Sequence, residues 1–150
     1  MKRKTCPPSL HPTYRPPVLI LWATGPVARW FMMLALCAAY IQGGLVKAFD
    51  VPGATAEMVH FGIQPAAPMA LATIVLELGA SAMVLSGRWR WLGALALAGF
   101  TLMANFVANR FWDAPAAERM MLANGFFEHI GLVGGLCLVA WMDLRERLDA

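Results

Sequence analysis

The 150-residue sequence is poor in charge and in the side chains that most often carry catalysis or bind metals. Only 14% of its residues are charged, against roughly a quarter in a typical soluble domain, which disfavours a soluble globular protein. One histidine, His129, lies in a long apolar stretch, whereas a bis-histidine haem needs two inside the membrane. The sequence contains no H-E-x-x-H motif, phosphate-binding loop, dinucleotide fingerprint or local Ser-His-Asp signature. No metal site and no covalently bound cofactor are therefore expected.

The three cysteines form neither a C-x-x-C pair nor a metal-type spacing. Cys37 and Cys137 fall in the first and last of the long apolar stretches, where cysteine most often packs as a small apolar side chain. A redox pair between these two cysteines stays open, and it requires that the two stretches touch at that depth.

Apolar residues make up 59% of the chain and are concentrated in four stretches, at residues 26–48, 66–87, 91–112 and 121–142. Each has about the 20 residues that a helix needs to cross a bilayer. Backbone groups in hydrocarbon must be hydrogen-bonded within the segment, so all four stretches are predicted to be helices. The short connection at 86–90 permits only an antiparallel hairpin. The sequence thus predicts an all-α fold, an antiparallel bundle of four transmembrane helices, as one domain over residues 18–150.

The remaining segments are expected to be short or irregular. Five prolines in residues 1–17 indicate a disordered cytoplasmic tail, and no apolar stretch follows its basic start at the distance typical of a signal peptide. Residues 18–25 either lie at the membrane interface or extend the first helix. In the first outer loop, residues 49–65, we expect a re-entrant segment or a short helix over 54–61 that ends at Gly62.

Positive charge gathers on one side of the predicted bundle. Nine of the twelve lysines and arginines lie on the side that carries both termini and the 86–90 loop, whereas Lys47, Arg110 and Arg119 lie on the other. Because positively charged loops stay in the cytoplasm, both termini are predicted to be cytoplasmic. The basic balance is thus an orientation signal, and the expected partner is the lipid bilayer, not nucleic acid.

Each predicted helix carries polar or small residues three or four positions apart, which places them on one face. Charged and amide side chains inside a membrane are costly and usually face a bundle interior or a wet cavity. We therefore expect one partly polar cavity, mainly in the outer half of the bundle. Its candidate ligand-binding residues are Gln42, Lys47, Glu77, Asn105, Asn109, Asn124, Glu128 and His129.

Structural alternatives stay open for these residues. The polar side chains can simply hydrogen-bond between helices, and Lys47 can pair with Asp50 at the water boundary. Glu77 is singled out because a carboxylate near mid-membrane needs either a partner or a proton. The small residues are predicted to let helices pack closely. They are Ala35, Ala39, Gly43, Gly131 and Gly135.

Five short segments occur along roughly residues 29–141 in a definite order and spacing. They are Arg29-Trp30, Gly43-Gly44-x-x-Lys47, Glu77-Leu78-Gly79, Leu85-Ser86-Gly87-Arg88 and residues 126–136. Together they resemble the DoxX family of small four-helix membrane proteins. The resemblance implies a multi-pass protein of the bacterial cytoplasmic (inner) membrane. The family takes its name from a subunit of a thiosulfate:quinone oxidoreductase, and some members are tied to thiol redox systems. The chain departs from the family pattern at Glu128-His129, where a lysine and a polar residue often stand.

Two functions are compatible with these expectations. In the first, the protein is a redox accessory subunit that binds a quinone or docks a redox partner. Asn105 or Gln42 would donate to the quinone carbonyls. Glu77, Glu128 or His129 would exchange the proton, and electrons would come from the partner. In the second, the protein is a non-enzymatic membrane scaffold or small-molecule carrier that uses the same cavity. Whether any reaction is catalysed stays open, but a non-catalytic subunit is favoured over a stand-alone oxidoreductase. Homo-oligomerisation also stays open.

Overall fold

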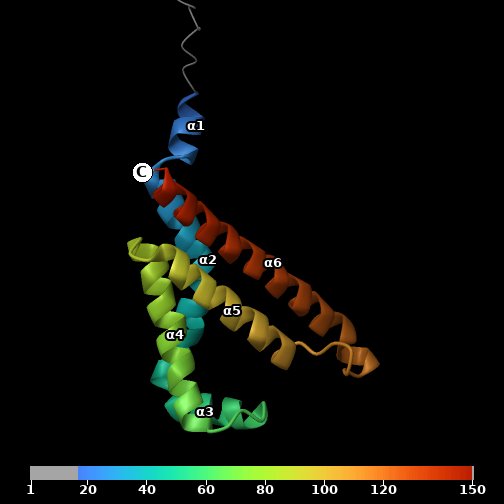
Figure 1. Cartoon of the computed structure of the whole chain (residues 1–150). Coiled ribbons are helices and arrows are strands. Elements are labelled where there is room, and N and C mark those ends of the chain that lie inside the picture. Colours follow the sequence, from blue (N-terminus) through green and yellow to red (C-terminus); the bar gives the residue numbers. More distant parts are fainter. Residues whose placement is uncertain (1–16, 150) are drawn as a thin grey trace, which may run out of the picture.

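The structure, a computed structural model, describes residues 17–149, and within that range the chain forms six helices (Figure 1). Four are long and apolar enough to cross a membrane: α2 (Pro26–Phe49), α4 (Ala66–Ser86), α5 (Arg90–Ala108) and α6 (Ala116–Leu148). Two are short: α1 (Val18–Ala23) and α3 (Val51–His60). The predicted all-α, four-span architecture is confirmed. Apart from Pro17, the predicted tail at 1–17 lies outside the described residues.

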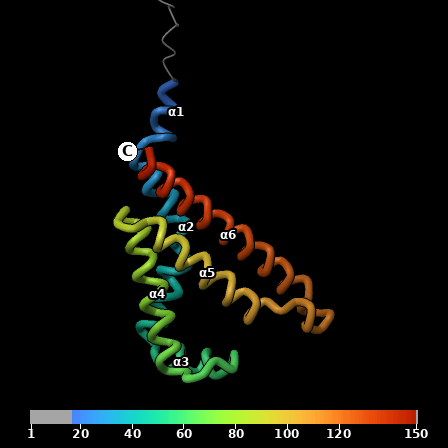
Figure 2. Tube along the Cα trace, in the orientation of Figure 1, coloured from blue at the N-terminus to red at the C-terminus, as the bar shows by residue number. Residues whose placement is uncertain are grey.

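The long helices pack in the order α2, α4, α5 and α6 (Figure 2). α6 runs along α5 and meets the first turns of α2, so the start of α2 and the end of α6 lie together. We call this the terminal end of the bundle, and the opposite end, where α3 packs on α4, the α3 end. Away from the terminal end, α5 and α6 diverge from α2 and α4 (Figures 1 and 2). The bundle is therefore a wedge that is closed at the terminal end.

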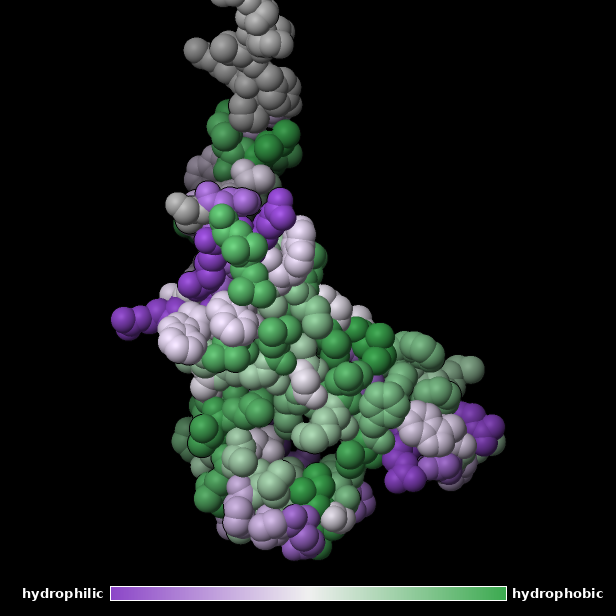
Figure 3. Space-filling model, in the orientation of Figure 1, coloured by the Kyte–Doolittle hydropathy of each residue, from purple (hydrophilic) through white to green (hydrophobic). Residues whose placement is uncertain are grey.

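The buried apolar side chains form two separate cores. The larger core joins all four long helices, and its fully buried side chains include Val84, Leu97 and Leu136. The smaller core joins α3 to the first half of α4 through Met58 and Ala70. The outward faces of the long helices are largely apolar (Figure 3). Such a surface is suited to contact with a lipid bilayer, where hydrocarbon surrounds the helices.

Local sequence signals explain where most helices start and stop. Pro26 occupies the first turn of α2, where its missing N–H costs nothing. Asp50 ends α2 and caps α3, because its carboxylate accepts a hydrogen bond of 2.9 Å from the Gly53 N–H. Gly62 and Gly87, which follow α3 and α4, adopt positive φ angles of 69° and 77°. The predicted short helix in the outer loop is confirmed, and the Asp50 cap makes it begin earlier than expected.

Three boundaries differ from the predictions. α5 ends at Ala108 and not at residue 112, because Arg110 pairs with Asp113 in a turn that precedes Pro115. α6 spans Ala116–Leu148, about 50 Å, instead of 121–142. Its ends carry charged residues, so hydropathy detects only the apolar middle. Residues 18–25 contain the separate helix α1 and do not extend α2.

Candidate functional site

A cavity of about 440 Å³ lies in the wedge between the two helix pairs. Its walls come from α2, α3, α4, α5 and α6, and the volume is within the range typical of small-molecule sites. Met103 and Val107 of α5 are exposed at its rim, so the cavity opens at the apolar surface of the bundle. Figure 3 shows this recess between the α3 end and the arm formed by α5 and α6, with a largely hydrophobic rim.

An ion pair between Lys47 and Glu77 lines this cavity. The ammonium nitrogen of Lys47 lies 3.3 Å from Oε2 and 3.4 Å from Oε1 of Glu77. The Glu77 side chain is only 7% exposed and that of Lys47 only 17%. Gly43, one helical turn before Lys47, lies beside the pair, and a methyl group there would be in ordinary contact with it, 3.4 Å from the ammonium nitrogen. Lys47 thus pairs with Glu77 rather than with Asp50.

The Lys47–Glu77 pair leaves hydrogen-bonding capacity unused. An ammonium group has three donors and a carboxylate has about four acceptor positions. Within residues 17–149, these two side chains hydrogen-bond only to each other, at long distances. Both groups line the cavity, so a polar ligand group that entered it would find a donor and an acceptor side by side.

Further polar groups stand around the pair. The Tyr40 hydroxyl hydrogen-bonds to Thr101 across α2 and α5, and both residues line the cavity. His129 of α6 lines the opposite wall, with Nδ1 2.6 Å from the Gly125 carbonyl oxygen. A carbonyl can only accept, so Nδ1 donates, and in the neutral ring Nε2 is left as an acceptor. Glu57 of α3 is exposed and lies where the cavity meets the surface.

Asn105 holds α5 to α6, and neither Asn105 nor its neighbour Asn109 lines this cavity. The fully buried Asn105 donates to the Phe126 carbonyl oxygen at 3.0 Å. Asn109 follows α5 and donates to the Asn105 side-chain oxygen at 2.8 Å. Asn105 thus makes an interhelical hydrogen bond, whereas the hydrogen bond of Asn109 joins two residues at the end of α5, with its side chain beside Gly125 of α6.

The expectation of one cavity for all eight candidates is wrong. Lys47, Glu77 and His129 line the main cavity, whereas Asn109, Asn124 and Glu128 line a separate hollow beside the start of α6. Gln42 lies in a groove on the outward face of α2. The prediction assumed that every stripe faces a common axis. α6 instead packs chiefly on α5, so Asn124 and Glu128 are exposed.

The small residues divide in a similar way. Ala39 and Gly43 line the cavity, and Gly135 approaches Leu36 closely enough for ordinary packing. Ala35 is exposed and Gly131 has no neighbour within 4 Å of an added methyl group, so neither packs helices within the chain. The close approaches occur instead at Gly44, against Leu78, and at Gly93, against Ala80. Cys37 and Cys137 are both free, the first buried and the second exposed, so they form no disulfide in this structure.

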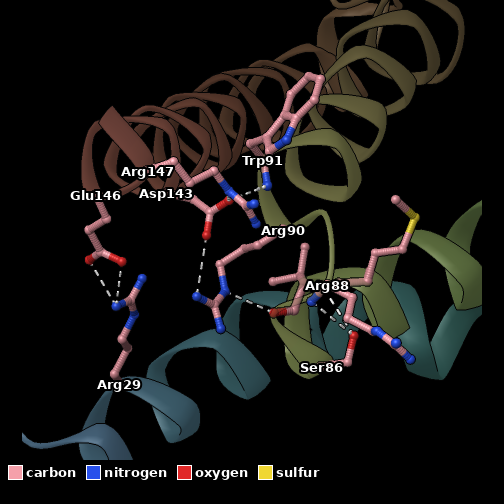
Figure 4. A network of polar contacts seen from close by, with 10 residues as sticks. Arg29, Ser86, Arg88, Arg90, Trp91, Asp143, Glu146 and Arg147 are labelled. Atoms are coloured by element: carbon pink, nitrogen blue, oxygen red, sulfur yellow. Dashed lines mark hydrogen bonds and ion pairs between the residues drawn. The ribbon is translucent and has the colours of Figure 1, made fainter. Parts of the chain in front are cut away.

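A charged cluster at the terminal end was not anticipated (Figure 4). Asp143 of α6 is 5% exposed, and its carboxylate pairs with Arg147 at 2.9 Å and Arg90 at 3.5 Å. It also accepts a hydrogen bond from the backbone N–H of Trp91, at the start of α5. Beside it, Arg29 pairs with Glu146 at 2.8 Å. These contacts tie the end of α6 to α5 and α2. In the sequence, the arginines indicated orientation only.

The fold and the cavity define a class, the multi-pass α-helical membrane proteins, and the bilayer surrounds this chain. Within that class the chain belongs to the DoxX family, since the DoxX family model matches residues 29–110, more than half of its length. The match includes Lys47 and Glu77 and ends before α6, so residues 126–136 lie outside it. Searches of curated proteins and of solved structures found no match. Among the described residues, no group of three or more His, Cys, Asp or Glu side chains is placed to hold a metal ion.

Proposed function

We propose that the protein binds the headgroup of a lipid-soluble quinone in the main cavity and acts as an accessory membrane subunit for a redox partner. The observation that carries this proposal is the Lys47–Glu77 pair, which has free hydrogen-bonding positions in a mostly apolar cavity. A quinone presents carbonyl acceptors for the Lys47 ammonium group on an apolar ring, and the hydroxyl groups of the quinol could donate to the Glu77 carboxylate. Its isoprenoid tail would leave through the apolar rim into the lipid.

The roles of individual side chains follow from their chemistry. The Lys47 ammonium group would donate to one quinone carbonyl, and the aromatic ring of Phe100 would pack against the quinone ring. Reduction to the quinol takes two electrons and two protons. The redox partner would supply the electrons, and protons would reach the carbonyl oxygens through Glu77 and His129 from water near Glu57.

The orientation in the membrane is part of the proposal. Within the described residues, Arg29, Arg88, Arg90, Arg145 and Arg147 lie at the terminal end. The positive-inside tendency would place this end at the cytoplasm of a bacterial inner membrane. The cavity would then lie in the outer half of the bilayer, nearer the outer water than the cytoplasm.

The test is quinone binding by the full chain in detergent and in bilayers. Mass spectrometry of the purified protein should detect retained quinone, and titration with the short-chain analogue decylubiquinone should give a Kd. Lys47→Met is expected to weaken binding at least tenfold, since it removes the charge-assisted hydrogen bond to a quinone carbonyl. Glu77→Gln should weaken binding to a similar extent, because it removes the carboxylate that holds the Lys47 ammonium group at the cavity. Glu128→Gln, an equivalent change outside the cavity, should leave Kd unchanged. Equal affinities for all four proteins would overturn the proposal.

A non-enzymatic lipophile carrier is the second candidate, and it is favoured by the mostly apolar cavity wall. The same mass-spectrometric inventory distinguishes the two functions. A retained lipid or other lipophile, with no quinone and no effect of Glu77→Gln on its amount, would support the carrier.

A further inference from the structure

The side chain of Gln42 points away from the bundle. The buried residues of α2 are Met33, Cys37, Tyr40 and Gly44. At about 100° per residue, Gln42 lies almost opposite the centre of that buried face. It is exposed, and its amide makes no hydrogen bond with any group in residues 17–149. Thr73, Glu77 and Asn105, by contrast, are polar span residues that face other helices.

The depth of Gln42 makes this exposure unfavourable for a single chain in a bilayer. Gln42 precedes Asp50, the end of α2, by eight residues, or about 12 Å along the helix. A glutamine side chain is too short to reach water from there. An amide without a hydrogen-bond partner is strongly disfavoured in hydrocarbon. The outward face of α2 therefore needs a polar partner at this depth.

The groove that contains Gln42 favours another helix as the polar partner. Gln42 lies in an apolar groove whose other lining residues are Leu34, Ala38, Ile41, Leu45, Val46 and Phe49. Positions 38, 42, 45 and 49 follow the alternating spacing of four and three that is typical of helices packed in left-handed pairs. Ala38, one turn before Gln42, is small enough for a second helix to approach closely.

We propose that this face of α2 binds the same face of a second copy of the chain, with Gln42 near a two-fold axis. A primary amide carries both a donor and an acceptor. Two copies related by a two-fold axis can therefore satisfy each other, the N–H of one amide donating to the oxygen of the other in both directions. The cavity-lining residues Gly43 and Lys47 lie on a different side of α2, so the dimer leaves the cavity open and does not depend on the proposed ligand.

The first test is the association of the full chain in vesicles of phosphatidylethanolamine and phosphatidylglycerol. Single-molecule photobleaching of a C-terminal fluorophore, over a series of protein-to-lipid ratios, gives the association constant. We expect dimers, with Gln42→Leu lowering the association constant about tenfold through the lost amide pair. Gln64→Leu, which changes the only other glutamine, should have no effect. Monomers at every ratio, or dimers unaffected by Gln42→Leu, would overturn the proposal.

The second test locates the interface with Gln42 left in place. Ala38→Cys and Leu45→Cys are made in a chain whose three native cysteines are replaced by alanine. Both should form disulfide-linked dimers on mild oxidation, whereas Val75→Cys, on the exposed face of α4, should not. Equal cross-linking at all three positions would indicate random collision and contradict the proposal. Cross-linking of Ala38→Cys in cells to a different protein, with none to a second copy, would contradict the proposed partner.

Discussion

Two buried carboxylates in the bundle, Asp143 and Glu77, are paired with basic side chains, but they differ in the number of donors around them. At the terminal end, where the helices converge, Asp143 has Arg147, Arg90 and a backbone N–H as partners. Near the middle of α4, where the helix pairs begin to diverge, Glu77 has Lys47 alone, at 3.3 Å and beside a cavity. A carboxylate with three donors fixes helices in place, whereas one with a single distant donor can still bind a ligand. We therefore expect Asp143 to have a structural role and Glu77 to have the proposed binding role.

The largest effect should come from removing the centre of the terminal cluster. Asp143→Ala leaves Arg90 without its carboxylate in a mostly buried position, so we expect the free energy of unfolding to fall by about 3 kcal/mol. Unfolding by denaturant in bicelles measures this change. Asp113→Ala is the matched control, because its pair with Arg110 is more than half exposed and should contribute less than about 1 kcal/mol. Equal losses of unfolding free energy in the two variants would mean that the Asp143 cluster does not stabilise the contact of α6 with α5.

Close packing near the terminal end gives the next effect. A methyl group on Gly93 would lie 2.7 Å from the carbonyl oxygen of Ala80 and 2.9 Å from the Cβ of Met83. Gly93→Ala must therefore push α5 away from α4, and it should cost about 1 to 3 kcal/mol of unfolding free energy. Gly99→Ala on the same helix meets nothing within 4 Å and should be neutral or slightly stabilising. A tolerated Gly93→Ala would contradict the close approach of α4 and α5.

Glu77→Gln should separate binding from stability. Lys47 stands in the last turn of α2 and can turn towards water when its partner loses charge, so the unfolding free energy should fall by only about 1 kcal/mol. The affinity for decylubiquinone should fall at least tenfold. Asp143→Ala should show the opposite pattern, with lower stability and unchanged affinity in the folded fraction. If both variants changed both quantities alike, the contrast between the two ends would be lost.

The smallest change in stability is expected at Gly43. A methyl group there would meet Lys47 and Glu77 at 3.4 to 3.7 Å, which is ordinary contact, so Gly43→Ala should alter the unfolding free energy by less than about 0.5 kcal/mol. Because the methyl group fills space beside the pair, decylubiquinone should bind several-fold more weakly. Gly79→Ala, with no neighbour within 4 Å, serves as the control and should change neither quantity. An unchanged affinity in Gly43→Ala would place the ligand elsewhere.

The sequence predicted the features that depend on local patterns. Hydropathy and length identified the four spans, and the position of Glu77 in mid-span marked it as a residue that needs a partner. The sequence could not predict which face of α2 packs on α4. Gly43 and Gly44 lie on neighbouring helix faces, and only the fold shows that Gly44 is the one that closely approaches α4. The sequence could not predict the tilt of α6 along α5 either. It exposes Glu128 and brings Asp143 to Arg90, two residues far apart in the sequence.

Photolabelling tests the binding role of the Lys47–Glu77 pair most directly. An azido-quinone is activated in bilayers that contain the full chain, and the labelled peptides are identified by mass spectrometry. The account predicts labels within residues 57–73 and 100–108, which line the cavity, and their loss when unlabelled decylubiquinone competes or when Glu77 is changed to glutamine. Labels confined to the outward face of α2 or to the hollow at Glu128, or labels that neither competition nor Glu77→Gln reduces, would contradict it.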